Sequence, residues 1–358
     1  MKTYIHLLGA LFMCYTSIIV ANDNMQPFPF SGELTLSSNY NAEINAFWLQ
    51  AQPLSFQGVD NKRLESFSLL GGNTRAIVIS QGRNESVLKY KEVAFDFFRQ
   101  GYDVFLLDHR GQGFSERFGG DQHRGYVNNF QDYVDDFNHY VTALELDKKY
   151  QQRYLLSHSM GGTISALYLA QYNHPFQSSV FYSPMFTINT APLPNFMAKL
   201  IAYSSASVCS WFSDKACYVP GGKGYQKKIF ENNQLTTSPR RFDASQYDFE
   251  HFPETQLGSA TMRWLATSLS ATEQAIEEAH NIDIPILVVQ AGNDQVVNGE
   301  GQHEFFDNVT YCKFNQFLTI EDAKHEILLE RDEFRTIALS HTLQFLSKTA
   351  QGKRSCIK

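Results

Sequence analysis

The sequence lacks several features that would point to large classes of protein. Basic residues are not in excess, since 30 Lys and Arg stand against 37 Asp and Glu and the formal net charge is −7. Nucleic-acid binding usually requires a basic patch, so this balance argues against a nucleic-acid partner. No group of Cys and His has the spacing of a zinc site, and we expect neither a metal nor a cofactor. The chain also contains no internal repeat and no low-complexity tract.

What is present is enough apolar material for a substantial core. Hydrophobic residues make up 43% of the 358 residues, and 29 Phe and 18 Tyr are among the aromatic ones. This length suits one large α/β domain or two ordinary ones.

The first residues resemble a secretory leader. Lys2 precedes an apolar run from Ile5 to Ala21, and polar residues follow. This order predicts a signal peptide over residues 1–21 and an exported protein, periplasmic or secreted, whose mature domain covers 22–358. The run approaches the shortest length that spans a bilayer, so an uncleaved leader anchored in the inner membrane is the alternative.

Cysteine usage agrees with export. Cleavage of the leader would remove Cys14 and leave an even number of cysteines, namely Cys209, Cys217, Cys312 and Cys356. An even count in an exported chain predicts disulfides, and four cysteines allow three pairings. We favour the local pair Cys209–Cys217, which leaves Cys312 to hold the C-terminal tail through Cys356.

Strand and helix patterns alternate along most of the chain. Two strands are expected within Ser55–Leu70, around a turn at Asp60-Asn61. Further short apolar runs predict strands, and periodic segments between them predict helices, at 75–82, 90–101, 102–113, 132–146, 153–158, 178–186, 285–294, 313–320 and 330–348. Such alternation predicts a mostly parallel sheet with helices on both faces.

One long segment breaks this rhythm. Residues 187–282 show no convincing strand pattern. They contain a Pro-Gly-Gly turn at 220–222 and several helical patches. An insertion of this size is too long for a simple loop. We therefore expect a helical cap over the edge of the sheet where the strands end, which is where open α/β sheets bind ligands.

A serine lies at the turn between an expected strand and an expected helix. The segment from Arg153 to Ala170 reads "RYLLSHSMGGTISALYLA", with Ser159 at the turn. Strand, Gly-x-Ser-x-Gly and helix together form a nucleophile elbow, although here Ser157 replaces the first glycine. The alternative is an ordinary turn, because Ser and Gly are common turn residues.

An acid and a histidine follow in the order that such a serine requires. Asp294 comes directly after one expected strand, and His325 lies in the loop after the next. A serine hydroxyl needs a base to remove its proton, and that base needs a carboxylate to orient it. Taken singly, Asp294 could be a turn residue and His325 a surface or capping residue. Together they predict the triad Ser159, Asp294 and His325, with the neighbouring His158 in a structural role.

Ester cleavage also requires hydrogen-bond donors for the oxyanion. One should be the backbone N–H of Met160, which follows the nucleophile. The other should come from the loop "SQGRNES", where Gly82 lets the backbone approach and Arg83 supplies its N–H. An ordinary glycine turn is the alternative for this loop.

These segments resemble the α/β-hydrolase superfamily, in particular its bacterial lysophospholipase L2 and monoacylglycerol lipase branch. The resemblance covers about residues 75–345 and rests on "SQGRNES", "LDHRGQGFSER", "LSHSMGGT", "QAGNDQVV" and "AKHEILLERD". It departs from the family pattern at Gln81, Asn84 and Ser157, where relatives often carry His, Gly and Gly. The departures spare the expected triad and affect the expected oxyanion geometry.

The resemblance implies an α/β-hydrolase fold with an inserted helical cap. It implies hydrolysis of the acyl ester of a lysophospholipid, or of another monoacyl lipid, and peripheral contact with a membrane. Arg83, Arg240 and Arg241 are the candidates to meet a substrate phosphate. Two alternatives stay open: a monoacylglycerol lipase or general carboxylesterase, and a non-catalytic protein of this fold that binds a lipid or a partner.

Overall fold

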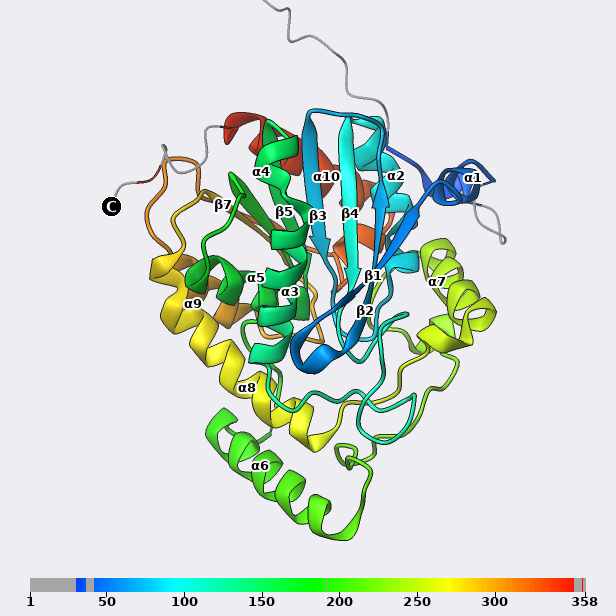
Figure 1. Ribbon diagram of the computed structural model, residues 1–358, viewed down its shortest axis with the longest axis vertical. Helices are drawn as coiled ribbons and strands as arrows, with labels where there is room; N and C mark the ends of the chain where they lie inside the picture. The colour runs from blue at the N-terminus through cyan, green and yellow to red at the C-terminus, as the bar shows by residue number, and fades with distance from the viewer. Residues whose placement is uncertain (1–29, 37–41, 191, 351–355, 357–358) are drawn as a thin grey trace, which may run out of the picture.

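An eight-stranded sheet runs through the protein in the order β1-β2-β4-β3-β5-β6-β7-β8 (Figure 1). The computed structural model describes residues 30–36, 42–190, 192–350 and 356. The strands are β1 (Gln52–Gln57), β2 (Arg63–Leu69), β3 (Arg75–Ser80), β4 (Tyr102–Asp108), β5 (Gln152–His158), β6 (Ser178–Tyr182), β7 (Ile286–Ala291) and β8 (Gln316–Ile320). Strand β2 pairs antiparallel with β1 and β4, and all other neighbours are parallel. The predicted mostly parallel sheet is confirmed.

Helices cover both faces of this sheet (Figure 1). Their bounds are α1 (Ala42–Trp48), α2 (Lys91–Arg99), α3 (Gln131–Leu144), α4 (Leu146–Lys149), α5 (Met160–Gln171), α6 (Asn195–Phe212), α7 (Pro239–His251), α8 (Met262–Glu277), α9 (Gly299–Asn308) and α10 (Asp332–Lys348). Buried residues of α3, α5, α8 and α9 form the core on one face. Those of α1, α2 and α10 form the core on the other.

The central strands contribute to both cores because side chains alternate along a strand. In β3, Ala76 and Val78 belong to the first core, whereas Ile77 and Ile79 belong to the second. Each of these four side chains is at most 1% exposed. A strand buried on both faces must be apolar throughout, which explains the continuous apolar run in the sequence.

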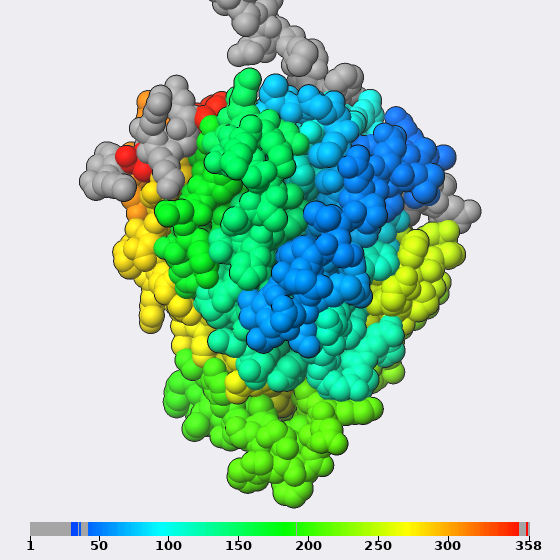
Figure 2. Space-filling view, in the orientation of Figure 1, coloured from blue at the N-terminus to red at the C-terminus, as the bar shows by residue number. Residues whose placement is uncertain are grey.

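The insertion expected at 187–282 divides into parts with different roles. Helix α6 projects from the body at the lower end of the molecule (Figures 1 and 2). Helix α7 packs beside the segment Val87–Tyr90. Helix α8, in contrast, contributes Trp264 and Ala271 to the main core. The part that projects as a cap therefore ends before Met262.

Two disulfides are present in the structure. Cys209–Cys217 closes the end of α6, and Cys312–Cys356 joins the segment before β8 to the C-terminal tail. The predicted leader, residues 1–21, lies outside the described residues. Within the described part of the chain, no helix is both long and apolar enough to cross a bilayer.

Candidate active site

Ser159 occupies a sharp turn between β5 and α5. Its φ of 51° and ψ of −120° are rare for a residue with a side chain, and such backbone strain is typical of functional sites. Three backbone hydrogen bonds hold it: the N–H of Ser159 donates to Tyr182 O at 3.1 Å, and its carbonyl accepts from Gly162 at 2.8 Å and Met185 at 3.0 Å. The turn presents the Ser159 hydroxyl at the carboxyl end of the sheet.

Close packing of α5 on β3 requires the glycine that follows the turn. A Cβ on Gly161 would lie 2.2 Å from Ser80 O and 2.6 Å from Gln81 O, both backbone atoms at the end of β3. Ser157 replaces the first glycine of the elbow pattern and is fully buried, with its hydroxyl 3.4 Å from Val180 O. A small side chain therefore fits where the family pattern has none.

The structure brings the three predicted triad residues together. His325 Nε2 lies 2.9 Å from Ser159 Oγ, and His325 Nδ1 lies 2.7 Å from Asp294 Oδ2. Because an ionised carboxylate can only accept, Nδ1 carries a proton, and in the corresponding tautomer Nε2 is the nitrogen that can accept from the serine hydroxyl. The side chains follow the carboxyl ends of β5, β7 and β8. These strands lie close together in the sheet, with β6 between β5 and β7.

Asp294 is held in its ionised form. Its second oxygen, Oδ1, accepts hydrogen bonds from the backbone N–H groups of Val296 at 2.8 Å and Val297 at 3.1 Å. Burial opposes ionisation, but the hydrogen bond and charge of His325, together with these two amides, lower the pKa of Asp294. The carboxylate is thus an anion at neutral pH, as the orientation of His325 requires.

The loop after β3 passes directly over the serine. A Cβ on Gly82 would lie 3.1 Å from Ser159 Cβ, so the backbone approaches closely because this residue is glycine. The Gly82 N–H is already engaged, since it donates to Glu85 Oε2 at 2.6 Å. For the Arg83 N–H, the described residues supply no acceptor. Met160 is the first residue of α5, where backbone N–H groups have no partner within the helix.

Comparison with known proteins agrees with this geometry. The family described as "Serine aminopeptidase, S33" matches residues 72–332. Lysophospholipase L2 of Escherichia coli K12 is 34% identical over 319 residues, which cover 87% of this chain and 93% of that protein. A probable lysophospholipase L2 of Haemophilus influenzae is 31% identical, with 86% and 95% covered.

This chain belongs to the lysophospholipase L2 and monoacylglycerol lipase branch of the α/β-hydrolases. It is a carboxylic ester hydrolase. Solved structures support the fold: a soluble variant of the monoglyceride lipase of Saccharomyces cerevisiae has a TM-score of 0.63 at 16% identity, covering 83% of this chain and 94% of that one. The monoacylglycerol lipase of Paleococcus ferrophilus has a TM-score of 0.59 at 17% identity, covering 83% and 98%.

Arg83 carries a charge without a matching anion. Its Nη2 donates to Gly258 O at 3.0 Å and its guanidinium lies 4.9 Å from the Trp264 ring. Its buried Nε has no acceptor among the described residues. No carboxylate among those residues forms an ion pair with Arg83. Burial of the guanidinium lowers the pKa of Arg83 to about 10. The side chain remains cationic at neutral pH.

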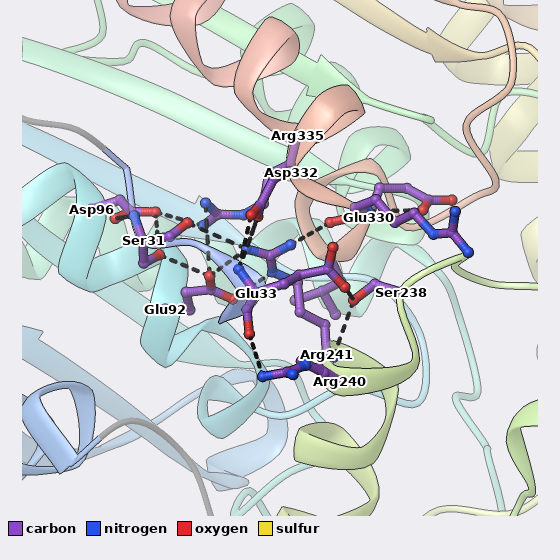
Figure 3. Close-up of polar contacts among 12 residues, drawn as sticks. Ser31, Glu33, Glu92, Asp96, Ser238, Arg240, Arg241, Glu330, Asp332 and Arg335 are labelled. Carbon is purple, nitrogen blue, oxygen red and sulfur yellow. Dashed lines mark hydrogen bonds and ion pairs between the residues drawn. The ribbon is translucent and has the colours of Figure 1, made fainter. Parts of the chain in front are cut away.

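Arg241, in contrast, is a structural residue, which corrects the expectation that it meets a substrate phosphate. It is 1% exposed, and its guanidinium donates to Glu92, Asp332 and the carbonyl of Glu330 (Figure 3). Every nitrogen already has an acceptor, so none is free for a ligand. Arg240 is exposed and donates to the carbonyls of Glu33 and Leu36 in the N-terminal segment. These two residues tie α7 to its neighbours.

Sequence reasoning missed a buried cluster of charged residues behind the triad. Glu85, Lys89, His158 and Glu326 are all at most 8% exposed and contact one another. Glu85 stood within the quoted loop motif and Glu326 directly follows His325, but no local pattern reveals contacts across 73 or 237 residues. Among the described residues, no group of three His, Cys, Asp or Glu is placed to hold a metal ion.

Proposed function

We propose that this protein hydrolyses the single acyl ester of a lysophospholipid to a fatty acid and a glycerophosphodiester. The observation that carries the proposal is the chain of contacts from Ser159 through His325 to Asp294, at 2.9 and 2.7 Å. The names of the two lysophospholipase L2 relatives support the substrate class.

The reaction follows from these contacts. His325 Nε2 takes the proton of Ser159 Oγ as that oxygen attacks the ester carbonyl, and Asp294 stabilises the resulting imidazolium. The backbone N–H groups of Arg83 and Met160 donate to the oxyanion. His325 then protonates the departing glycerol oxygen, which leaves an acyl-enzyme. Water, activated by the same histidine, attacks the acyl carbonyl and releases the fatty acid and Ser159.

Ser159→Ala tests the nucleophile. The variant should lose ester hydrolysis and labelling by a serine-directed phosphonate, while its circular dichroism spectrum stays that of the wild type. Wild-type activity in Ser159→Ala would overturn the proposal. Absence of any ester hydrolysis by the correctly folded wild type would instead favour a non-catalytic lipid-binding protein.

A substrate panel tests the lipid class. Lysophosphatidylethanolamine, a monoacylglycerol and a diacyl phospholipid of matched chain length should be compared below their micelle-forming concentrations. We expect the lysophospholipid to be hydrolysed fastest. A clear preference for monoacylglycerol would support the alternative of a monoacylglycerol lipase, which the monoglyceride lipase relatives suggest. A preference for the diacyl lipid would contradict a site for one acyl chain.

Arg83 is the residue we propose to meet the phosphate of the head group. It follows Gly82 next to the serine, and it is a half-buried cation without a carboxylate partner in the described structure. Arg83→Met keeps most of the stem and removes the charge, so kcat/KM for the lysophospholipid should fall while that for monoacylglycerol should not. An equal loss on both substrates would indicate that Arg83 only supports the fold.

Peripheral membrane contact and export complete the proposal. Apolar side chains on α6 are exposed to a degree that is unusual in a monomer, including Phe196 at 69%, Trp211 at 77% and Phe212 at 83%. Residues 192–228, which include α6, carry five lysines and one acid, and three of these lysines, Lys199, Lys215 and Lys227, also form ion pairs with acids elsewhere in the chain. An apolar and basic surface suits a bilayer that contains anionic lipid.

Vesicle binding tests this contact. Trp211→Ser with Phe212→Ser should reduce co-sedimentation with vesicles of phosphatidylethanolamine and phosphatidylglycerol, and leave hydrolysis of a soluble ester unchanged. Equal vesicle binding by the variant and the wild type would exclude α6 as the contact. We also propose that the protein is exported after cleavage at residue 21, which the N-terminal sequence of the mature protein tests directly.

A further inference from the structure

His158 lies next to the nucleophile and contacts two hydrogen-bond acceptors. Its Nδ1 lies 3.3 Å from Glu85 Oε2, and its Nε2 lies 3.2 Å from the backbone carbonyl of His325. A carboxylate and a carbonyl can only accept. A neutral imidazole carries one N–H and satisfies one of them, whereas an imidazolium carries two and satisfies both. The residue is 3% exposed, so bulk water does not reach either contact.

A protonated His158 brings the charges that contact it into balance. Lys89 Nζ lies 2.9 Å from Glu85 Oε1 and 2.5 Å from Glu326 Oε1, which places one cation between two carboxylates. The side chains of all three are at most 9% exposed. Burial of a net negative charge is costly, which favours a second cation in contact with Glu85. His158 is the residue that contacts Glu85 from the opposite side.

Electrostatics favour the same state. Burial alone would lower the pKa of His158, but the charge and hydrogen bond of Glu85, and the charge of Glu326, raise it. Lys89 opposes this effect weakly. Glu85 also accepts from Tyr90 at 2.7 Å, and burial together with the Glu85 charge raises the pKa of that phenol, which stays neutral. The pKa of Glu85 itself lies well below its usual range because Lys89 and His158 outweigh its burial.

The cluster connects three parts of the active site. Glu85 Oε2 accepts from the Gly82 N–H at 2.6 Å and so shapes the loop that carries the Arg83 N–H. His158 directly precedes Ser159. The carbonyl that His158 contacts belongs to His325, whose ring centroid lies 4.9 Å away. The His158 imidazolium is therefore linked to three parts of the site: to the oxyanion loop through Glu85, to Ser159 along the backbone, and to the base through the His325 carbonyl.

We propose that His158 is a positioning residue that works as an imidazolium, holding the backbone of His325 and the loop 82–85 in the geometry that the triad requires. This inference rests on the proposed function for its effect on turnover, but the charge state of His158 stands without it. When His158 loses one ring proton, the neutral ring can donate only one hydrogen bond. It then loses its contact with either the Glu85 carboxylate or the His325 carbonyl, and the backbone is no longer held.

The direction of the pH effect follows from the raised pKa. The contribution of His158 is complete below the pKa of an ordinary histidine and is lost as pH rises through its raised value in the folded protein. Activity should therefore decline on the alkaline side through loss of this proton. The other titrating groups that face the cluster are Lys89, Tyr90, Glu326 and, from the cap, Lys228. Burial and the charges of Lys89 and Arg83 lower the pKa of Lys228. The titration of Lys228 is therefore measured alongside that of His158.

Nuclear magnetic resonance of the unaltered protein gives a direct test. Two-bond ¹H–¹⁵N spectra of protein labelled in histidine distinguish an imidazolium from either neutral tautomer, and His158→Gln assigns the resonance. We expect both ring nitrogens of His158 to be protonated at pH 7.5. A neutral ring at that pH would overturn the proposal, whatever the enzyme's activity.

Kinetics test the consequence for turnover. With a soluble p-nitrophenyl ester and active sites counted by phosphonate labelling, His158→Gln should lower kcat by on the order of 100-fold with little change in KM, since the base is displaced. Glu85→Gln should move the alkaline limb of the kcat–pH profile to lower pH. His341→Gln, on α10 and outside the cluster, is the matched control and should behave as wild type.

Each kinetic outcome has a separate meaning. An unchanged alkaline limb in folded Glu85→Gln would contradict the proposal. A loss of kcat without any displacement of the pH profile would show a packing role only, and would overturn it as well. If the wild type hydrolyses no ester, the proposed function fails, while the charge state read from the ring nitrogens still decides the state of His158.

Discussion

Replacing Gly161 with alanine tests how the nucleophile and the oxyanion loop are held together. The added Cβ would lie 2.2 Å from Ser80 O and 2.6 Å from Gln81 O, whereas ordinary contacts of a Cβ begin near 3.4 Å. The chain must therefore open by about 1 Å between α5 and β3, and backbone atoms cannot avoid the clash by a rotamer change. A displacement of this size within a catalytic site costs on the order of 100-fold in rate.

The assay should separate a displaced site from an unfolded one. We expect Gly161→Ala to lower kcat for a soluble ester by about that factor, measured per site labelled by a phosphonate under forcing conditions. Gly72→Ala is the control, because a Cβ at Gly72 would meet no atom within 4 Å, while its positive φ of 71° strains an alanine in another way. It should lose some stability and keep its kcat. If folded Gly161→Ala turns over like the wild type, the contact between α5 and β3 does not set the catalytic geometry.

Further substitutions probe the base, the tail and the buried arginine. Asp294→Asn should lower kcat by about four orders of magnitude, since the amide would stabilise the wrong tautomer of His325; a loss below tenfold in steady-state assays would contradict this. Serine in place of Cys312 and Cys356, which are 44 residues apart, should lower the free energy of unfolding by about 4 kcal/mol in urea titrations. Arg241→Met should cost about 3–5 kcal/mol in the same titrations, because it leaves Glu92 without a cation that it contacts at 2.8 Å; an unchanged midpoint would argue against that.

The sheet and the triad geometry could be foreseen because both follow from local patterns. Strands buried on two faces must be continuous apolar runs, and the carboxyl ends of parallel strands meet at one edge. Asp294 and His325 lie in the loops that follow the apolar runs of β7 and β8, so their approach to Ser159 needed no knowledge of distant contacts. Both cysteine pairs were also expected, since Cys209 and Cys217 are only eight residues apart and the other two remained.

Features that depend on distant contacts could not be foreseen. Arg83 and Arg241 both have polar neighbours in the sequence, which gives no sign of their partners. Arg241 forms ion pairs with Glu92 and Asp332, whereas Arg83 has no carboxylate partner among the described residues. Helix α8 looks like the rest of the insertion, and its packing on α5 and α9 places it in the core. The charge of His158 likewise depends on Glu85, which is 73 residues away.

The N-terminal segment near Arg241 has a consequence for the order of folding. The Glu33 N–H donates to Asp332, which is 299 residues further along the chain. The carbonyl of Ser31 accepts a hydrogen bond from Arg241, and the Ser31 N–H donates to Asp96 (Figure 3). Closing so long a loop is slow and gains nothing until both ends exist. A growing chain therefore cannot complete this corner of the domain before α10 has been synthesised. Until then Arg241 can contact Glu92 but lacks Glu330 and Asp332, and Glu92 and Asp96 lack Arg335.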